Sequence, residues 1–199
     1  VGAWLPLVAY VGSIAVFHLV VQKAALPLAP PTFLRFVVEV AVGVVLYDLL
    51  FHPIHASLHS SKFPAWWRKL HRTHHDARPT ERAGHSLMPL ETVQHSYADG
   101  FLQVACNVMV QRLAIWGVFG GGCLLPKHPL SRVAHNLIVT YLLAEAHSGY
   151  DLPWMTHRAW PALFGGARAH DAHHLQGAPN YHQFFDVPKL KLKPRPLTT

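Results

Sequence analysis

The stretch FLRFVVEVAVGVVLYDLLF, from Phe33 to Phe51, is an apolar run that only Arg35, Glu39 and Asp48 interrupt. A helix that crosses a lipid bilayer needs about 20 predominantly apolar residues. We therefore predict that this stretch is a membrane-spanning helix and that the fold is all-α.

Three further apolar stretches accompany this run, at Trp4–Val21, Phe101–Leu125 and Val133–Ala146. The last two are shorter or more polar, so we expect them to form a hairpin that packs against the first two, with its turn between Gly120 and Pro129. These stretches predict an integral membrane helical bundle of about four transmembrane helices. Residues 1–199 are expected to form a single domain with a motif-bearing core at about 45–187.

The composition agrees with a membrane protein. The chain has 199 residues, of which 51% are hydrophobic and 14% charged, whereas about 25% are charged in an ordinary soluble protein. The net charge of +7 does not indicate nucleic-acid binding, because the basic residues flank apolar runs and form no aromatic-interleaved stripe. They concentrate in residues 52–99 and in the tail, which the positive-inside rule places together on the cytosolic side. The chain opens on Val1, so we expect a trimmed N-terminus.

Three histidine clusters lie outside the apolar stretches: His55-Ala-Ser-Leu-His59, His71-Arg-Thr-His74-His75 and His170-Asp-Ala-His173-His174. Side chains three and four residues apart share a helix face, so each segment is expected to aim its rings at a common point. Eight imidazoles are more than one tetrahedral metal needs, and two metals could share them. The alternative interpretation is a surface patch that titrates with pH.

Imidazole suits zinc, iron, copper and nickel alike, so the ligand type leaves the metal open. A structural zinc site usually recruits cysteine, and neither Cys106 nor Cys123 lies near the clusters. A cysteine-free, histidine-rich site beside a membrane favours iron that reacts with oxygen. We expect a histidine-rich metal-binding cap at the cytosolic face of the bundle.

Other residues are candidates for supporting roles. His147, directly after the fourth apolar stretch, is a ninth predicted ligand, and one of His85 and His95 in the connecting segment is a further candidate. His52, His157 and His182 are weaker candidates. Ligating imidazoles are commonly oriented by carboxylates behind them, and the candidates for this role are Asp48, Asp76, Glu91, Asp151 and Asp171.

These motifs, in this order around apolar hairpins, resemble the fatty acid hydroxylase superfamily of integral membrane di-iron oxygenases. The segment His147-Ser-Gly-Tyr-Asp-Leu-Pro-Trp154 is similar to a motif of its sterol branch, the C4-methyl sterol oxidases and cholesterol 25-hydroxylase-like enzymes. Thr156-His157-Arg158 and Asn180-Tyr181 continue the match. The chain departs from the family pattern at Ala56, Met88 and Ala169, where the family usually has Arg, His and His.

The resemblance implies a monooxygenase with two iron ions that hydroxylates or oxidises a lipid, most directly a sterol. It also implies electron supply by a separate cytochrome b5 and an NAD(P)H-dependent reductase, and a multi-pass location in the endoplasmic reticulum membrane with the metal site facing the cytosol. Within the same enzyme class, a fatty acyl or sphingolipid substrate, a desaturation or an aldehyde cleavage stays open. Outside it, the alternative is a membrane metal-binding or transport protein. Transporters usually bind their cargo near the membrane midplane, whereas these clusters flank the spans.

Overall fold

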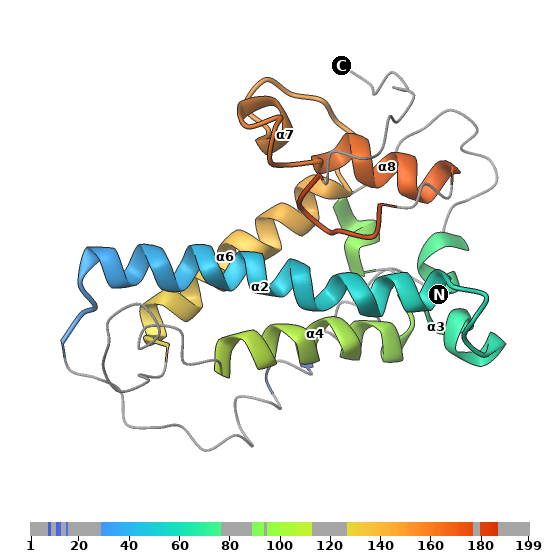
Figure 1. Ribbon diagram of the computed structural model, residues 1–199, viewed down its shortest axis with the longest axis horizontal. Helices are drawn as coiled ribbons and strands as arrows, with labels where there is room; N and C mark the ends of the chain where they lie inside the picture. The colour runs from blue at the N-terminus through green and yellow to red at the C-terminus, as the bar shows by residue number, and fades with distance from the viewer. Residues whose placement is uncertain are drawn as a thin grey trace.

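The computed structural model describes residues 29–76, 89–93, 95–112, 127–176 and 180–186, together with Val8, Val11, Gly12 and Ala15. Within these residues the chain is helical, with no β-strand beyond an isolated bridge between Phe164 and Phe185, which confirms the predicted all-α class. The elements shown in Figure 1 are α2 (Phe33–His59), α3 (Ala65–Asp76), the 3-10 helix η1 (Pro89–Val93), α4 (Tyr97–Arg112), α6 (Pro129–Ala146), α7 (Thr156–Ala159) and α8 (Gly166–Gln176).

Helix α2 is the centre of the fold, and both α4 and α6 pack against it (Figure 1). Its side chains Tyr47 and Phe51 are almost fully buried. Full burial of one such side chain contributes on the order of 1.5–3 kcal/mol. The shared core takes residues from all three helices and from one segment near the C-terminus: Val44, Tyr47, Phe51, Cys106, Val110, Val139, Leu142, Leu143 and Phe184.

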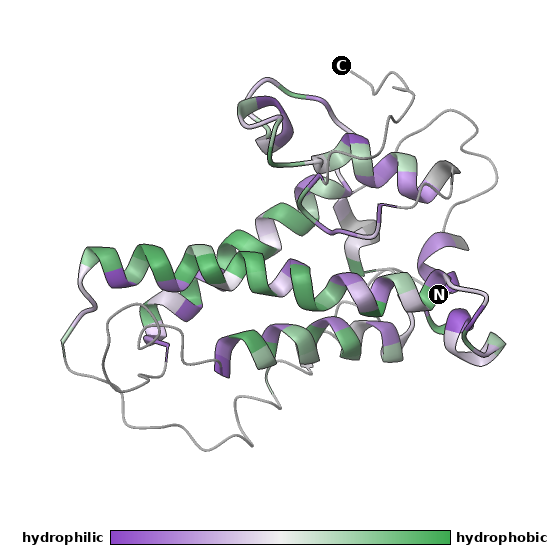
Figure 2. Cartoon of the chain, viewed as in Figure 1, coloured by the Kyte–Doolittle hydropathy of each residue, from purple (hydrophilic) through white to green (hydrophobic). Residues whose placement is uncertain are grey.

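Helix α2 continues beyond the apolar run from which it was predicted. It begins after Thr32, whose hydroxyl accepts a hydrogen bond from the backbone N–H of Arg35, and it ends at His59. The predicted span and the first histidine motif are therefore one helix, hydrophobic over most of its N-terminal part (Figure 2). Because the middle of α2, from Val44 to Phe51, is packed in the core, the position of the histidines at its C-terminal end is fixed.

The membrane-spanning part of the prediction is not supported by the helices themselves. None of the helices in the described ranges is both long and apolar enough to cross a membrane. The first apolar stretch, apart from four residues, and the turn of the expected hairpin, apart from residues 127–129, lie outside the described residues. The two arms of that hairpin are in contact, because the side-chain amide oxygen of Asn136 accepts hydrogen bonds from the side-chain amides of Asn107 and Gln111 at 3.0 Å each.

Two side-chain contacts place α3 against its neighbours. The indole N–H of Trp67 donates to the hydroxyl of Ser57 at 2.9 Å, which folds α3 back onto the end of α2. The hydroxyl of Ser96 donates to the carbonyl oxygen of Leu70 at 2.5 Å, which connects α3 to the start of α4. Helix α8 packs on α6 above the same end of α2 (Figure 1). The fold thereby brings the three histidine motifs to one end of the bundle.

Candidate metal centre

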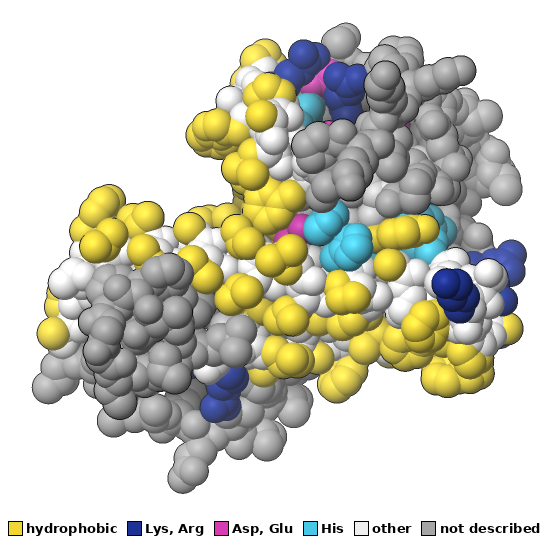
Figure 3. Space-filling view, viewed as in Figure 1, with side chains coloured by type: hydrophobic (Ala, Val, Ile, Leu, Met, Phe, Trp, Pro, Cys, Tyr) yellow, Lys and Arg dark blue, Asp and Glu magenta, His cyan; other side chains and the backbone are white. Residues whose placement is uncertain are grey.

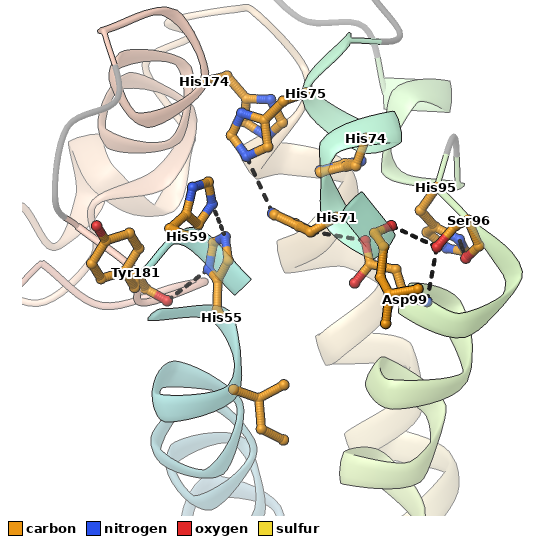
Figure 4. A network of polar contacts seen from close by, with 12 residues as sticks. His55, His59, His71, His74, His75, His95, Ser96, Asp99, His174 and Tyr181 are labelled. Atoms are coloured by element: carbon orange, nitrogen blue, oxygen red, sulfur yellow. Dashed lines mark hydrogen bonds and ion pairs between the residues drawn. The ribbon is translucent and has the colours of Figure 1, made fainter. Parts of the chain in front are cut away.

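The nine histidines predicted as ligands converge in two groups. The first, the five-histidine group, consists of His55, His59, His71, His75 and His173. The second, the four-histidine group, consists of His74, His147, His170 and His174. Within each group the candidate ligand nitrogens all lie within 4.8 Å of one another. The groups are adjacent, because the rings of His75 and His174 stack with their centroids 4.2 Å apart (Figure 4).

The separations between nitrogens match the edges of a metal coordination sphere. In the four-histidine group the Nε2 atom of His147 lies 3.2 Å from that of His74 and 2.9 Å from that of His170. In the five-histidine group the Nε2 atoms of His55 and His59 are 3.3 Å apart. Two nitrogens bound at about 2.1 Å to one metal lie about 3.0 Å apart at a right angle and about 3.4 Å apart at the tetrahedral angle. The residues therefore fit two metal ions.

Each HxxHH motif is divided between the two groups, so the prediction that each segment aims its rings at one point is wrong for these two motifs and is confirmed for His55 and His59. His71 and His75 belong to the five-histidine group, whereas His74 belongs to the four-histidine group. On α8 the allocation is reversed, because His170 and His174 join the four-histidine group and His173 the other. Residues four apart on a helix are turned by only about 40°, but adjacent residues by about 100°. Adjacent histidines therefore belong to two different groups.

Hydrogen bonds to the outer ring nitrogens orient ligands in both groups. The Nδ1–H of His55 donates to the carbonyl oxygen of Tyr181 at 2.9 Å, and that of His147 to the carbonyl oxygen of Leu143 at 2.9 Å. The Nδ1–H of His71 donates to the Asp99 carboxylate at 2.8 Å (Figure 4). A proton held at Nδ1 leaves the lone pair at Nε2 facing the centre, as metal ligation requires.

Burial keeps these imidazoles neutral. It is the main cause that lowers the pKa of His59 to about 3 and that of His147 to about 4, with neighbouring histidines adding to the effect. Burial and neighbouring histidines likewise hold the pKa values of His55, His74 and His170 well below 6.5. A neutral imidazole is the form that binds a metal, so the centre is in its ligating form at neutral pH.

Asp99 is a functional residue that the sequence analysis missed. It lies in the first turn of α4, is fully buried, and bonds to His71 on α3. In the sequence, Asp99 stands out only as a carboxylate just before an apolar stretch. It follows its partner His71 by 28 residues. Because both groups consist of histidines, Asp99 supplies negative charge next to a centre that would hold two cations.

Several weaker candidates lie beside the two groups or outside the described residues. His95 is buried next to Asp99 but belongs to neither group. Asp171 is buried on α8, and its predicted role behind a ligand stays a prediction. His85 lies outside the described residues, as do the side chains of Asp76 and Glu91.

The other candidate histidines and carboxylates bond to one another instead. The ring of His157 donates to Asp151 at 2.9 Å, which also binds Arg158. His182 donates to Asp48 at 2.5 Å, and the ring of His52 stacks on that of His182 with centroids 4.1 Å apart. None of these three histidines and two carboxylates belongs to either of the two histidine groups.

Comparisons with known proteins agree with this centre. The sequence pattern described as "Fatty acid hydroxylase" matches residues 40–188. The chain is 30% identical over 184 residues to a cholesterol 25-hydroxylase-like protein of Danio rerio, covering 89% of this chain and 63% of that protein. It is 29% identical to cholesterol 25-hydroxylase of Mus musculus, covering 88% of this chain and 53% of that protein. It is 26% identical to a methylsterol monooxygenase of Aspergillus fumigatus, covering 78% of this chain and 47% of that protein.

The chain therefore spans about half to two-thirds of the length of these relatives. No solved structure matches the chain.

Proposed function

Because this chain belongs to the fatty acid hydroxylase family, we propose that it is a membrane monooxygenase that uses two iron ions to hydroxylate a lipid. The observation that carries the proposal is the pair of adjacent, all-histidine groups. A sterol is the substrate class that the names of the relatives support, since they are a cholesterol hydroxylase and a methylsterol monooxygenase.

The proposed reaction consumes one O2, two electrons and two protons for each C–H bond that is hydroxylated. One oxygen atom enters the C–H bond to give an alcohol, and the other leaves as water. Two bound iron ions would supply the activation of O2. The chain's own part is to hold nine imidazoles in place and to exclude bulk water, since His55, His74, His147, His170 and His173 are buried.

The exposed hydrophobic side chains support contact with a bilayer. Leu49 on α2, Phe101 on α4 and Leu137 on α6 are each more than half exposed. Hydrophobic side chains cover much of the visible surface of these helices, and histidines reach the surface where α8 faces α2 (Figure 3). Large exposed apolar surfaces mark contacts with membranes or partners. A lipid that moves sideways within the bilayer would then reach the centre without crossing water.

The electrons must come from another protein, and α3 offers a face that suits an acidic donor. Its inner face carries the ligand histidines, and Arg68, Lys69 and Arg72 on the same helix are exposed. A helix is about 10–12 Å across, so a donor bound there would lie close to the ligands. We propose that cytochrome b5, reduced by an NAD(P)H-dependent reductase, docks at the cytosolic face of the endoplasmic reticulum membrane.

Incorporation of labelled oxygen tests the proposal. Membranes from a eukaryotic host that expresses the chain would receive NADPH and 18O2, and their sterols and acyl lipids would be analysed by mass spectrometry. We expect label in sterols that is absent with the His74→Ala variant. Label confined to acyl lipids would retain the monooxygenase and overturn the sterol assignment. No label in an iron-loaded, folded protein supplied with cytochrome b5 and its reductase would overturn the activity.

A further inference from the structure

The segment of residues 180–186 crosses the five-histidine group and contacts three of its histidines through Tyr181. The backbone carbonyl oxygen of Tyr181 accepts the Nδ1–H of His55 at 2.9 Å. The Tyr181 ring stacks on that of His59, with centroids 5.3 Å apart, and meets that of His173 edge-on at 5.6 Å. The ligand geometry of this group therefore depends on where residue 181 lies.

The buried carboxylate of Asp48 holds the residues directly after Tyr181. Its Oδ1 atom accepts the backbone N–H of Gln183 at 2.6 Å and that of Phe184 at 2.9 Å. Its Oδ2 atom accepts the Nδ1–H of His182 at 2.5 Å. Asp48 lies two turns of α2 before His55, on the same helix. One carboxylate thus binds three successive residues of a segment more than 130 positions away.

The far side of the segment is attached independently of Asp48. The Phe184 ring is buried against Tyr47 with centroids 5.6 Å apart, and the backbone N–H of Asp186 donates to the carbonyl oxygen of Leu163 at 3.0 Å. These contacts fix residues 184–186. Loss of the Asp48 carboxylate would therefore release mainly residues 181–183 and leave the end of the segment in place.

We propose that Asp48 is a positioning residue for the five-histidine group, acting through residues 182–184 to keep the Tyr181 carbonyl against His55. The inference rests on the proposed function, because it requires a metal in that group. In the four-histidine group, His147 is oriented by the carbonyl of Leu143 on α6 and not by residues 181–183. The effect of Asp48 should therefore be confined to one of two metals.

Metal titration of the purified full chain tests this assignment without any activity measurement. Loss of a residue behind a ligand typically weakens metal binding about 10- to 100-fold. We expect Asp48→Ala to weaken one of two iron(II) dissociation constants by that factor and to leave the other unchanged. The matched control is Asp151→Ala, which removes a carboxylate bound to His157 and Arg158 only. It should leave both constants unchanged.

Two milder variants keep the inference testable if Asp48→Ala fails to fold. Asp48→Asn retains an oxygen for the N–H groups of Gln183 and Phe184 but loses the acceptor for His182, so it should weaken the same single constant only slightly. His182→Ala removes only the hydrogen bond from His182 to Asp48. It should weaken the same dissociation constant as Asp48→Ala does, but by a smaller factor. Unchanged constants in both Asp48→Ala and His182→Ala would overturn the assignment, as would equal weakening of both metals. A wild-type protein that binds no metal would instead overturn the proposed function.

Discussion

At the scale of single residues, the centre depends on which nitrogen of each imidazole carries the proton. Asp99 and the carbonyl oxygens of Tyr181 and Leu143 each take an Nδ1–H and so direct Nε2 to the metal side. The spacing of the histidines was sufficient to predict eight of the nine that converge in the two groups. Their hydrogen-bond partners were not predictable, because two of them are backbone carbonyls that any residue type provides.

Replacement of His74 by alanine should remove one of four ligands from the four-histidine group. We expect the protein to lose that metal and its turnover to fall to background, while the fold is retained, because the two HxxHH helices keep their other contacts. Metal analysis together with product formation measures this. The control is His128→Ala, which removes a helix N-cap at the opposite end of α6. Full activity and two metals in His74→Ala would refute its role as a ligand.

Asp99→Asn keeps the shape of the side chain but removes its charge. A neutral amide oxygen polarises the His71 imidazole less, so we expect metal affinity to fall by about 10-fold. Competition with a chelator measures the change. Glu39→Gln is the matched control, because Glu39 is equally buried but bonds to Arg35 and the backbone of His128 at the other end of α2. A similar loss of metal affinity in the two variants would contradict a specific role of Asp99, because it would reflect a general effect on the fold.

At the scale of elements, the apolar runs predicted the positions of helices but not their ends. The run at Phe33–Phe51 becomes the helix Phe33–His59, and the stretch at Val133–Ala146 begins earlier, at Pro129. The HxxHH spacing predicted helical histidine segments, which α3 and α8 are. The division of each HxxHH motif between the two histidine groups could not be predicted. It depends on how α3 and α8 face one another across the centre.

Helix α8 depends on Gly166, its first residue, which has a φ of 53°. A Cβ atom there would lie 2.5 Å from Nδ1 of the buried His157 ring. A side chain in this backbone region costs about 1–3 kcal/mol, so Gly166→Ala should lower the melting temperature. Thermal unfolding of the metal-loaded protein measures this. The control is Gly12→Ala, whose added methyl group meets nothing within 4 Å. It should leave the melting temperature unchanged. Equal stability of the two variants would contradict the prediction.

At the scale of the whole molecule, the centre concentrates ionisable rings that must stay neutral. The pKa of His59 is lowered to about 3 and that of His147 to about 4, whereas an unfolded histidine titrates near 6.5. Between these values the unfolded chain binds more protons than the folded one, so stability falls as the pH falls. Composition and charge did not predict these lowered pKa values, because they arise from the burial of rings that the fold brings together.

We therefore expect the free energy of unfolding of the metal-free protein to be highest above pH 6.5 and to decrease progressively toward pH 4. Denaturant unfolding in detergent at a series of pH values measures this. Bound metal should extend the stable range to lower pH, until protons displace it from the imidazoles. A metal-free protein that is as stable at pH 4.5 as at pH 7.5 would contradict the buried, neutral state of these histidines.

The most direct test of the account is the number of metal ions that one chain holds. Native mass spectrometry of the protein released from detergent gives this number from the intact mass. We predict two metal ions per chain in the wild type, and one in a variant in which His74 and His147 of the four-histidine group are both replaced by alanine. A single metal ion, or none, in the wild type expressed with ample iron would contradict the two-metal centre.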